Sequence, residues 1–215
     1  MRRRRGAGAA PPDLAAELLR VPPVAAGQRV ALFGGSFNPP HAGHRAVADA
    51  ALRRLALDWV WWIVTPGNPL KSSGELASLA HRVAAAEATA AHPRIRVTAF
   101  EAAIGTRYSA DLVAYLGKRL PHVRLVWLMG ADNLAELHRW QEWRTIVQCV
   151  PMAVVDRPGA SLKALSSPAA RTFAAARWPE RCAAALADAT PPAWVFLHAP
   201  LDPSSSTALR ASGGR

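Results

Sequence analysis

Residues 33–44 read F-G-G-S-F-N-P-P-H-A-G-H, and their types and spacing suit phosphate chemistry. Gly34 and Gly35 follow a short apolar run, and glycines let the backbone approach a ligand closely. His41 and His44 are three residues apart, so they share one face if a helix begins here. A helix N-terminus offers N–H groups and partial positive charge to an anion. Each feature alone is common in turns, but together they predict a phosphate site between a strand and a helix.

Segments that resemble strands and helices alternate from residue 28 onward. Together they form the framework that would hold residues 33–44 in place. The hydrophobic pattern predicts strands at 30–33, 58–65, 95–100, 123–129, 150–155 and 194–198. It predicts helices at 43–57, 76–91, 109–120, 131–147 and 168–187, and a short helix near the end of the chain. This order indicates an α/β fold, a doubly wound parallel sheet with helices on both faces. Ligands bind such sheets beyond the carboxyl ends of the strands, where the pattern places Gly34 and Gly130.

Composition limits the classes of protein that fit this chain. Its 215 residues suffice for a single domain, which we expect over 29–215. The formal net charge of +11 suits nucleic-acid binding, an enzyme of polyanionic nucleotides, or merely an Arg-rich codon bias. Outside the Arg2–Arg5 run the arginines are scattered, so no stable nucleic-acid partner is expected. Residues 1–28 are rich in Arg, Ala, Pro and Gly and are expected to form a disordered basic N-terminal extension.

The remaining composition predicts a cytoplasmic protein. Cys149 and Cys182 are too few for a metal cluster or a disulfide framework, which fits a reducing compartment. The basic N-terminus lacks the apolar stretch of a signal peptide. No run approaches the roughly 18 apolar residues of a membrane span, so no membrane partner is expected. The oligomeric state is left open by the sequence.

The string at 33–44 resembles the G-G-x-F-x-P-x-H-x-G-H signature of the nucleotidylyltransferase superfamily, with every position filled. The segment 130–143, with G-A-D-N-L and then W-x-x-W, is similar to nicotinate-nucleotide adenylyltransferases. So is S-S-S-T-A-L-R at 204–210, which matches an S-S/A-T-x-x-R element. T-P-G-N-P-L-K at 65–71, R-P-G at 157–159 and the Tyr-Ser pair within 105–111 extend the resemblance. The resemblance implies a Rossmann-like fold and covers about 29–210.

The resemblance also implies roles for individual residues. Trp140 would stack on a pyridine ring, with Trp143 as its structural partner. Arg210 would clamp the leaving pyrophosphate, since it lies at i+3 from Thr207 and can bind bidentately. The catalytic residues expected are His41, His44 and Arg210. The residues expected to bind ATP and its phosphates are Gly34, Gly35, Ser36, Phe37, His41, His44, Lys71, Gly130, Asp132, Ser205, Ser206, Thr207 and Arg210. Those expected to bind nicotinate mononucleotide are Ser36, Tyr108, Ser109, Asp132, Trp140 and Arg157.

The reaction implied is transfer of the adenylyl group of ATP to nicotinate mononucleotide, giving deamido-NAD and pyrophosphate. The attacking phosphate is already ionised at neutral pH, so the site needs alignment and charge stabilisation and no general base. Mg²⁺ is expected as a cofactor, held mainly by substrate phosphates, with no metal site made by the protein. Two alternatives remain: another nucleotidylyltransferase, for pantetheine phosphate or a cytidylyl group, and a non-catalytic basic nucleic-acid binder. Preference between nicotinate and nicotinamide mononucleotide also stays open.

Overall fold

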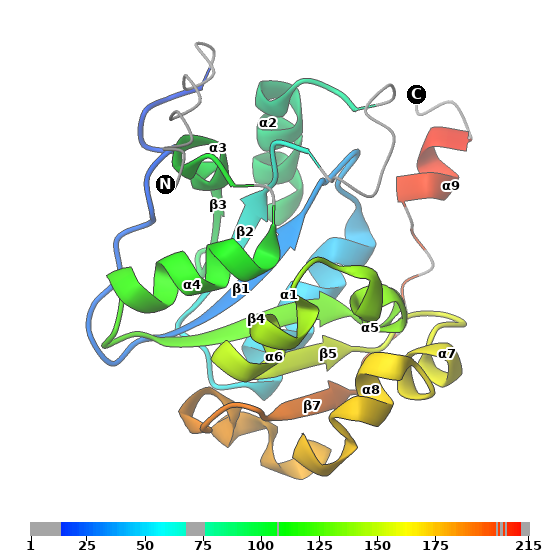
Figure 1. The fold of residues 1–215 in the computed structure, drawn as a ribbon. Helices are drawn as coiled ribbons and strands as arrows, with labels where there is room; N and C mark the ends of the chain where they lie inside the picture. The colour runs from blue at the N-terminus through cyan, green and yellow to red at the C-terminus, as the bar shows by residue number, and fades with distance from the viewer. Residues whose placement is uncertain are drawn as a thin grey trace, which may run out of the picture.

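The computed structural model describes residues 14–67, 76–106, 108–200, 202, 204 and 206–211. Its strands are β1 (Arg29–Gly35), β2 (Trp59–Val64), β3 (Ile95–Thr98), β4 (Arg124–Gly130), β5 (Met152–Val155), β6 (Arg177–Trp178) and β7 (Trp194–Leu197). They form a seven-stranded sheet in the order β3-β2-β1-β4-β5-β7-β6, and every neighbouring pair is parallel (Figure 1). The chain runs outward from β1 to β3 and then returns to β4 on the other side of β1. The β1–β4 junction is therefore a topological switch point, where such sheets bind ligands.

Helices cover both faces of this sheet, as the sequence predicts. They are α1 (Ala42–Arg54), α2 (Leu79–Ala90), α3 (Phe100–Ile104), α4 (Ser109–Arg119), α5 (Ala131–Glu136), α6 (Trp143–Cys149), α7 (Ser161–Leu165), α8 (Pro168–Thr172) and α9 (Ser206–Ala211), with 3₁₀ turns η2 (Leu137–Arg139), η3 (Ala174–Ala176) and η4 (Glu180–Asp188). Buried side chains of α1, α2 and η4 pack on one face, and those of α3 to α8 pack on the other. No helix of the described ranges has the length and apolar character needed to cross a membrane.

The central strands are apolar on both sides because both of their faces are covered. In β2, Trp62 and Val64 point toward the α1 face, whereas Trp61 and Ile63 point toward the α4 face. All four side chains are fully buried. Continuous apolar runs are typical of parallel strands covered by helices, which is why hydrophobicity alone located β2. The predicted α/β fold with a doubly wound parallel sheet is confirmed.

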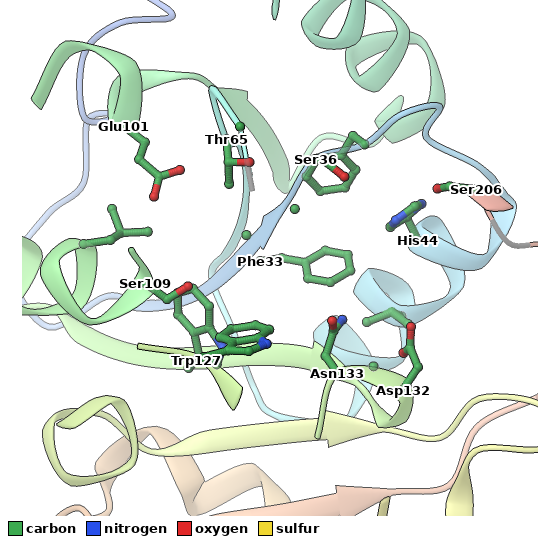
Figure 2. Close-up of a pocket in the computed structure, with 18 of the residues that line it drawn as sticks. Phe33, Ser36, His44, Thr65, Glu101, Ser109, Trp127, Asp132, Asn133 and Ser206 are labelled. Atoms are coloured by element: carbon green, nitrogen blue, oxygen red, sulfur yellow. The ribbon is translucent and has the colours of Figure 1, made fainter. Parts of the chain in front are cut away.

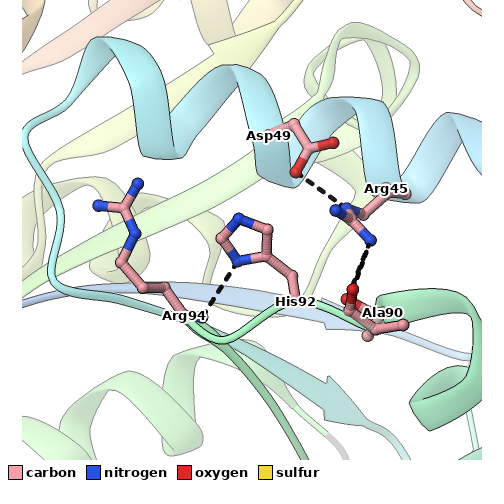
Figure 3. Close-up of polar contacts among 6 residues, drawn as sticks. Arg45, Asp49, Ala90, His92 and Arg94 are labelled. Atoms are coloured by element: carbon pink, nitrogen blue, oxygen red, sulfur yellow. Dashed lines mark hydrogen bonds and ion pairs between the residues drawn. The ribbon is translucent and has the colours of Figure 1, made fainter.

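Arg45 ties α1 to the end of α2 (Figure 3). Its Nε donates to Oδ1 of Asp49 at 2.9 Å, and its Nη1 donates to the carbonyl oxygens of Ala90 and Ala91 at 3.2 Å each. A guanidinium at a helix C-terminus satisfies terminal carbonyls and complements the helix dipole. These contacts fix the orientation of α1, and with it the first helical turn that carries His44.

The segment before β1 packs against the sheet from Leu14 onward. Leu14 and Leu18 contact the apolar cluster on the α1 face, and Val21 contacts the opposite one. The carbonyl oxygen of Leu18 accepts from the backbone N–H of Ala99 at 2.8 Å and from Oγ1 of Thr98 at 3.0 Å. The part of the predicted extension that the structure describes, 14–28, thus runs from the end of β3, at Thr98, to the start of β4, where the carbonyl oxygen of Gln28 accepts from the backbone N–H of Arg124. Residues 1–13 lie outside the described residues.

Two long helices predicted by composition are broken in the structure. The predicted helix 131–147 divides into α5, η2 and α6, because Glu142 adopts a left-handed conformation with φ 52° before α6. The predicted helix 168–187 holds α8, the two-residue strand β6 and η4, since Trp178 pairs with Val195 at the sheet edge. Alanine-rich sequence favours helices, but pairing to an open strand outweighs that weak preference. The short helices α3 and α7 carry too few residues to show a helical period.

Candidate active site

A cavity of about 440 Å³ opens at the carboxyl ends of β1 and β4, at the switch point of the sheet (Figure 2). Its volume lies within the range of small-molecule sites. Gly34 and Gly35 of β1 line its middle, with the start of α1 on one sheet face and α3 and α4 on the other. In Figure 2, His44 and Ser206 lie on one side of the cavity, and Glu101 and Ser109 lie on the opposite side. We call these sides the histidine end and the tryptophan end, the latter for Trp127.

The two imidazoles predicted to share a helical turn lie against each other. His41 is the N-cap of α1 and His44 follows within the first turn, with ring centroids 3.9 Å apart. The backbone N–H of His41 donates to Nδ1 of His44 at 3.3 Å, so Nε2 of His44 carries the ring proton. Burial, and then the nearby charge of Arg157, lower the pKa of His41 from 6.5 to about 4. His41 is therefore a neutral imidazole at physiological pH.

The loop between β1 and α1 is held from behind by a buried cation. Arg82 of α2 is 1% exposed, and its Nη1 donates to the carbonyl oxygens of Ser36 and Thr65 at 2.7 Å each. The same guanidinium reaches the carbonyls of Pro66 (3.3 Å) and Ala77 (2.9 Å). It thus joins the ends of β1 and β2 to the start of α2. Sequence analysis missed Arg82, although an Arg among the apolar positions of the predicted helix 76–91 was an available signal.

Phe37 anchors the same loop by its ring. The ring is 1% exposed and stacks on Trp62, with centroids 4.9 Å apart and planes at 10°. The backbone of Phe37 is left-handed, with φ 45°, which is uncommon for a bulky residue and persists only where packing enforces it. Phe37 borders the cavity, but its side chain belongs to the core, so its contribution is to shape the loop.

The C-terminal helix α9 docks on the loop of the opening string, although 167 residues of sequence or more separate them. Oγ of Ser206 donates to the carbonyl oxygen of Pro39 at 2.8 Å, and Nη1 of Arg210 donates to that of Asn38 at 2.6 Å. The two segments that the resemblance assigns to the ATP site thus contact each other through Ser206 and Arg210. Lys71, Ser205 and the side chain of Thr207 lie outside the described residues.

Asp132 and Arg157 meet at a glycine. A Cβ atom on Gly130 would lie 2.5 Å from Oδ1 of Asp132 and 3.2 Å from Cγ of Arg157, so a side chain here would displace the Asp132 carboxylate and press on Arg157. Nη2 of Arg157 also donates to the carbonyl oxygen of Ser204 at 2.6 Å. Gly130, Asp132 and Arg157 all line the cavity. A carboxylate and a guanidinium are thus held beside the neutral imidazole of His41.

Aromatic side chains line the tryptophan end. Trp127 and Trp140 meet edge to face, with ring centroids 6.4 Å apart, and both border the cavity together with Tyr108 and Ser109. Trp143 is only 8% exposed and packs against Phe173 within the core. Trp140 therefore lies at the cavity and Trp143 in the core, while the stacking role that the resemblance implies for Trp140 stays a prediction. The sequence pattern does not identify Trp127 as a cavity residue, because it places Trp127 within the buried strand predicted at 123–129.

A buried carboxyl group also faces the tryptophan end. Glu101 of α3 is 1% exposed, lines the cavity, and its Oε2 atom has no hydrogen-bond partner among the described residues. Burial raises the pKa of Glu101 to about 8. Oγ1 of Thr65, another cavity residue, is likewise buried without a partner in the described part of the chain. Glu101 was missed by sequence analysis, although it follows the carboxyl end of a predicted strand, where site residues are expected.

The described residues contain no group of three or more His, Cys, Asp or Glu side chains arranged to hold a metal ion. Asp132 is the carboxylate that borders the cavity at the strand ends near His41. This donor set fits a Mg²⁺ ion that arrives with substrate phosphates and takes few protein ligands.

Comparison with known proteins shows the family of this chain. The sequence matches the family model "Cytidylyltransferase-like" over residues 32–212, which defines the chain as a nucleotidyltransferase. Proteins of Agrobacterium fabrum and Brucella suis, each named "Probable nicotinate-nucleotide adenylyltransferase", are 58% identical to it over 181 residues. The match spans 84% of this chain and 97% and 93% of those proteins. The chain belongs to the nicotinate-nucleotide adenylyltransferase family.

The fold is similar to that of a solved structure as well. The Plasmodium falciparum nicotinic acid mononucleotide adenylyltransferase complexed with NaAD matches with a TM-score of 0.62 at 15% sequence identity. The match covers 86% of this chain and 83% of the other. At that identity the similarity concerns the Rossmann-like fold alone.

Proposed function

We propose that this chain transfers the adenylyl group of ATP to nicotinate mononucleotide, giving deamido-NAD and pyrophosphate. The observation that carries the proposal is the single cavity with two different ends. The histidine end offers hydrogen-bond donors and a helix N-terminus, which suit phosphates. The tryptophan end offers aromatic faces, which suit a pyridine ring. Relatives 58% identical carry the name of this activity.

In the proposed reaction, the phosphate of the mononucleotide attacks the α-phosphorus of ATP in line with the departing pyrophosphate. Because that phosphate is ionised at neutral pH, no residue needs to remove a proton. Nε2–H of His44 donates to the transferring phosphate, and the N-terminus of α1 adds its backbone N–H groups. His41 enters as a neutral imidazole, so it contributes a directed hydrogen bond to the phosphates.

Charged side chains around the histidine end offset the charge that builds up on the leaving group. Arg157 borders the cavity, and Arg210 is held on the loop at Asn38. Ser206 donates to the same loop and also lines the cavity. Lys71, Ser205 and Thr207 remain candidates for the same task on the basis of their motifs. Asp132 and Ser36 are proposed to contact the ribose or the phosphate groups between the two ends.

Mg²⁺ is the proposed cofactor. It would neutralise phosphate charge and orient the triphosphate, with Asp132 as the protein carboxylate placed to reach it. Trp140 is proposed to stack on the pyridine ring, with Tyr108 and Ser109 close to its substituent. We also propose that the protein works in the cytoplasm without a stable nucleic-acid partner.

A turnover assay tests the proposal. The protein is incubated with ATP, Mg²⁺ and either nicotinate or nicotinamide mononucleotide, while pyrophosphate and the dinucleotide product are both measured. Pantetheine phosphate replaces the mononucleotide in a parallel reaction. We expect pyrophosphate and dinucleotide in equal amounts with a pyridine mononucleotide and none with pantetheine phosphate. Turnover of pantetheine phosphate alone would show that the proposed substrate is wrong.

A further inference from the structure

Glu101 presents an unsatisfied carboxyl group to the cavity. Its side chain is 1% exposed, and Oε2 has no partner among the described residues. Figure 2 shows the carboxyl group directed toward the cavity from α3. Leaving a buried polar atom unpaired is costly, and such atoms in folded proteins usually have a partner. A bound ligand is therefore the expected partner of Glu101.

The position of Glu101 indicates which part of the ligand it meets. Phe100 and Leu112, from the elements around Glu101, belong to the apolar cluster on the α4 face, whereas α1 with His44 lies on the other face. Figure 2 also shows Glu101 on the side of the cavity opposite His44 and Ser206. Glu101 thus faces the tryptophan end, where the pyridine ring is proposed to bind, and not the triphosphate.

No described residue supplies a charge that stabilises the ionised form of Glu101. β2, which packs on α3, consists of W-V-W-W-I-V and has no titratable side chain. The titratable groups of the other described elements around it and of the cavity wall are Glu17, Arg20, Tyr108, Asp111, Tyr115, Lys118, Arg119, Asp132, Arg139, Arg157, His41 and His44. Burial alone accounts for the raised pKa of Glu101, about 8, with no contribution from any of these groups.

We propose that Glu101, as a neutral carboxylic acid, donates a hydrogen bond to the carboxylate of the pyridine ring and so selects nicotinate over nicotinamide mononucleotide. This inference rests on the proposed function of the same cavity. A protonated carboxyl group supplies the donor that a carboxylate needs, and the pair shares one proton. An ionised Glu101 would instead repel the nicotinate carboxylate at close range. The nicotinamide amide can pair with either form, because it both donates and accepts.

The selectivity should therefore depend on pH. At pH 7, one unit below the pKa of about 8, about nine-tenths of Glu101 is protonated. At pH 9, one unit above it, about one-tenth is protonated. The fraction of protein that can donate this hydrogen bond therefore falls about tenfold between pH 7 and pH 9. Both substrates carry the same phosphate, so its ionisation cancels in their ratio, and Glu101→Gln reports what the other cavity groups contribute to the pH dependence. We therefore measure selectivity as the ratio of kcat/KM for nicotinate mononucleotide to kcat/KM for nicotinamide mononucleotide.

The experiment measures this ratio from pH 6.5 to 9.5 for the wild type, for Glu101→Gln and for the control Glu87→Gln. Glu87 is an exposed carboxylate on α2, away from the cavity-lining residues. We expect the preference for nicotinate to fall about tenfold between pH 7 and 9 in the wild type and the control. In Glu101→Gln the ratio should stay constant, because the amide does not titrate. A constant wild-type ratio, or a Glu101→Gln ratio that still falls, would overturn the inference.

Calorimetry of the wild type provides a second readout that does not require an active variant. Binding of nicotinate mononucleotide at pH 8.5 should take up about three-quarters of a proton, measured in two buffers of different ionisation enthalpy, because the ligand carboxylate holds Glu101 protonated. Binding of nicotinamide mononucleotide should take up clearly less. Equal proton uptake would overturn the inference, while turnover would still support the proposed function. Absence of turnover with both mononucleotides would instead overturn the proposed function.

Discussion

Replacement of Glu101 by glutamine should stabilise the protein, and the gain should grow with pH. The two side chains have nearly the same size and shape, so packing around α3 changes little. The described residues offer no hydrogen bond that the carboxyl group could lose at Oε2. What changes is ionisation: glutamic acid must be neutral in the folded protein but is charged in the unfolded chain, whereas glutamine is neutral in both.

The magnitude follows from the pKa of Glu101, which burial raises from 4.5 to about 8. A raised pKa contributes stability that is fully present below the unfolded value, near pH 4.5, and is lost as the pH rises through the folded value. Each tenfold change in proton affinity is worth about 1.4 kcal/mol, so taking up this proton at pH 7 costs about 3 kcal/mol. That is a large fraction of the 5–15 kcal/mol typical of a folded domain.

Urea unfolding at pH 5 and at pH 7.5 measures the effect. At pH 5 the wild type and Glu101→Gln should differ by less than about 1 kcal/mol, and at pH 7.5 the variant should be more stable by about 4 kcal/mol. Glu87→Gln, at an exposed position, should follow the wild type at both pH values. An equal difference at the two pH values would refute the reasoning, because it would mean that Glu101 does not take up a proton on folding.

Three further substitutions test the rest of the site. His44→Ala should lower kcat by roughly 10²-fold, the scale of one lost charge-stabilising donor, while the exposed His81→Ala should not; similar rates in both variants would contradict the role of His44. Trp140→Ala should raise KM for the mononucleotide far more than KM for ATP, whereas Trp143→Ala should cost about 3 kcal/mol of stability and leave the KM ratio unchanged. Arg82→Gln should cost about 3 kcal/mol or more in urea unfolding, since four backbone carbonyls lose their donor; wild-type stability would show that water replaces the guanidinium there.

Sequence reasoning predicted the fold well because its signals were local. Each parallel strand of the centre is a continuous apolar run, and the Gly-Gly and His pair mark one strand–helix turn. The motif at 204–210 could be linked to the opening string only by resemblance, since no local pattern brings Ser206 to Pro39. The packing of 14–28 and the strand Arg177–Trp178 could not be read from local patterns. Each depends on a distant partner, Thr98 or Val195, that the sequence pattern does not identify.

Glu101, Arg82 and Trp127 escaped prediction for a related reason. An isolated Glu or Arg in a sequence is normally read as a surface residue, because charged side chains are rarely fully buried. Burial of Glu101 becomes visible only once α3 packs beside β2. Burial of Arg82 becomes visible only once the β1–α1 connection and both ends of the β2–α2 connection meet around it. The strand pattern predicts Trp127 as a core residue, and it is buried, but its position at the switch point also makes it part of the cavity wall.

Two buried ionisable side chains near the cavity, Arg82 and Glu101, have different tasks: one holds the structure and the other is placed to bind a ligand. Arg82 is surrounded by carbonyl acceptors, so its charge is satisfied without any ligand and its task is to hold the loops. Glu101 has an unpaired atom that faces a cavity. Among the described residues, eight buried side-chain polar atoms lack partners, and four of these belong to residues that line the cavity: His41, Thr65, Glu101 and Trp127. These unpaired atoms occur at both ends of the cavity. That distribution is expected if one extended ligand, anionic at one end and aromatic at the other, supplies their hydrogen-bond partners.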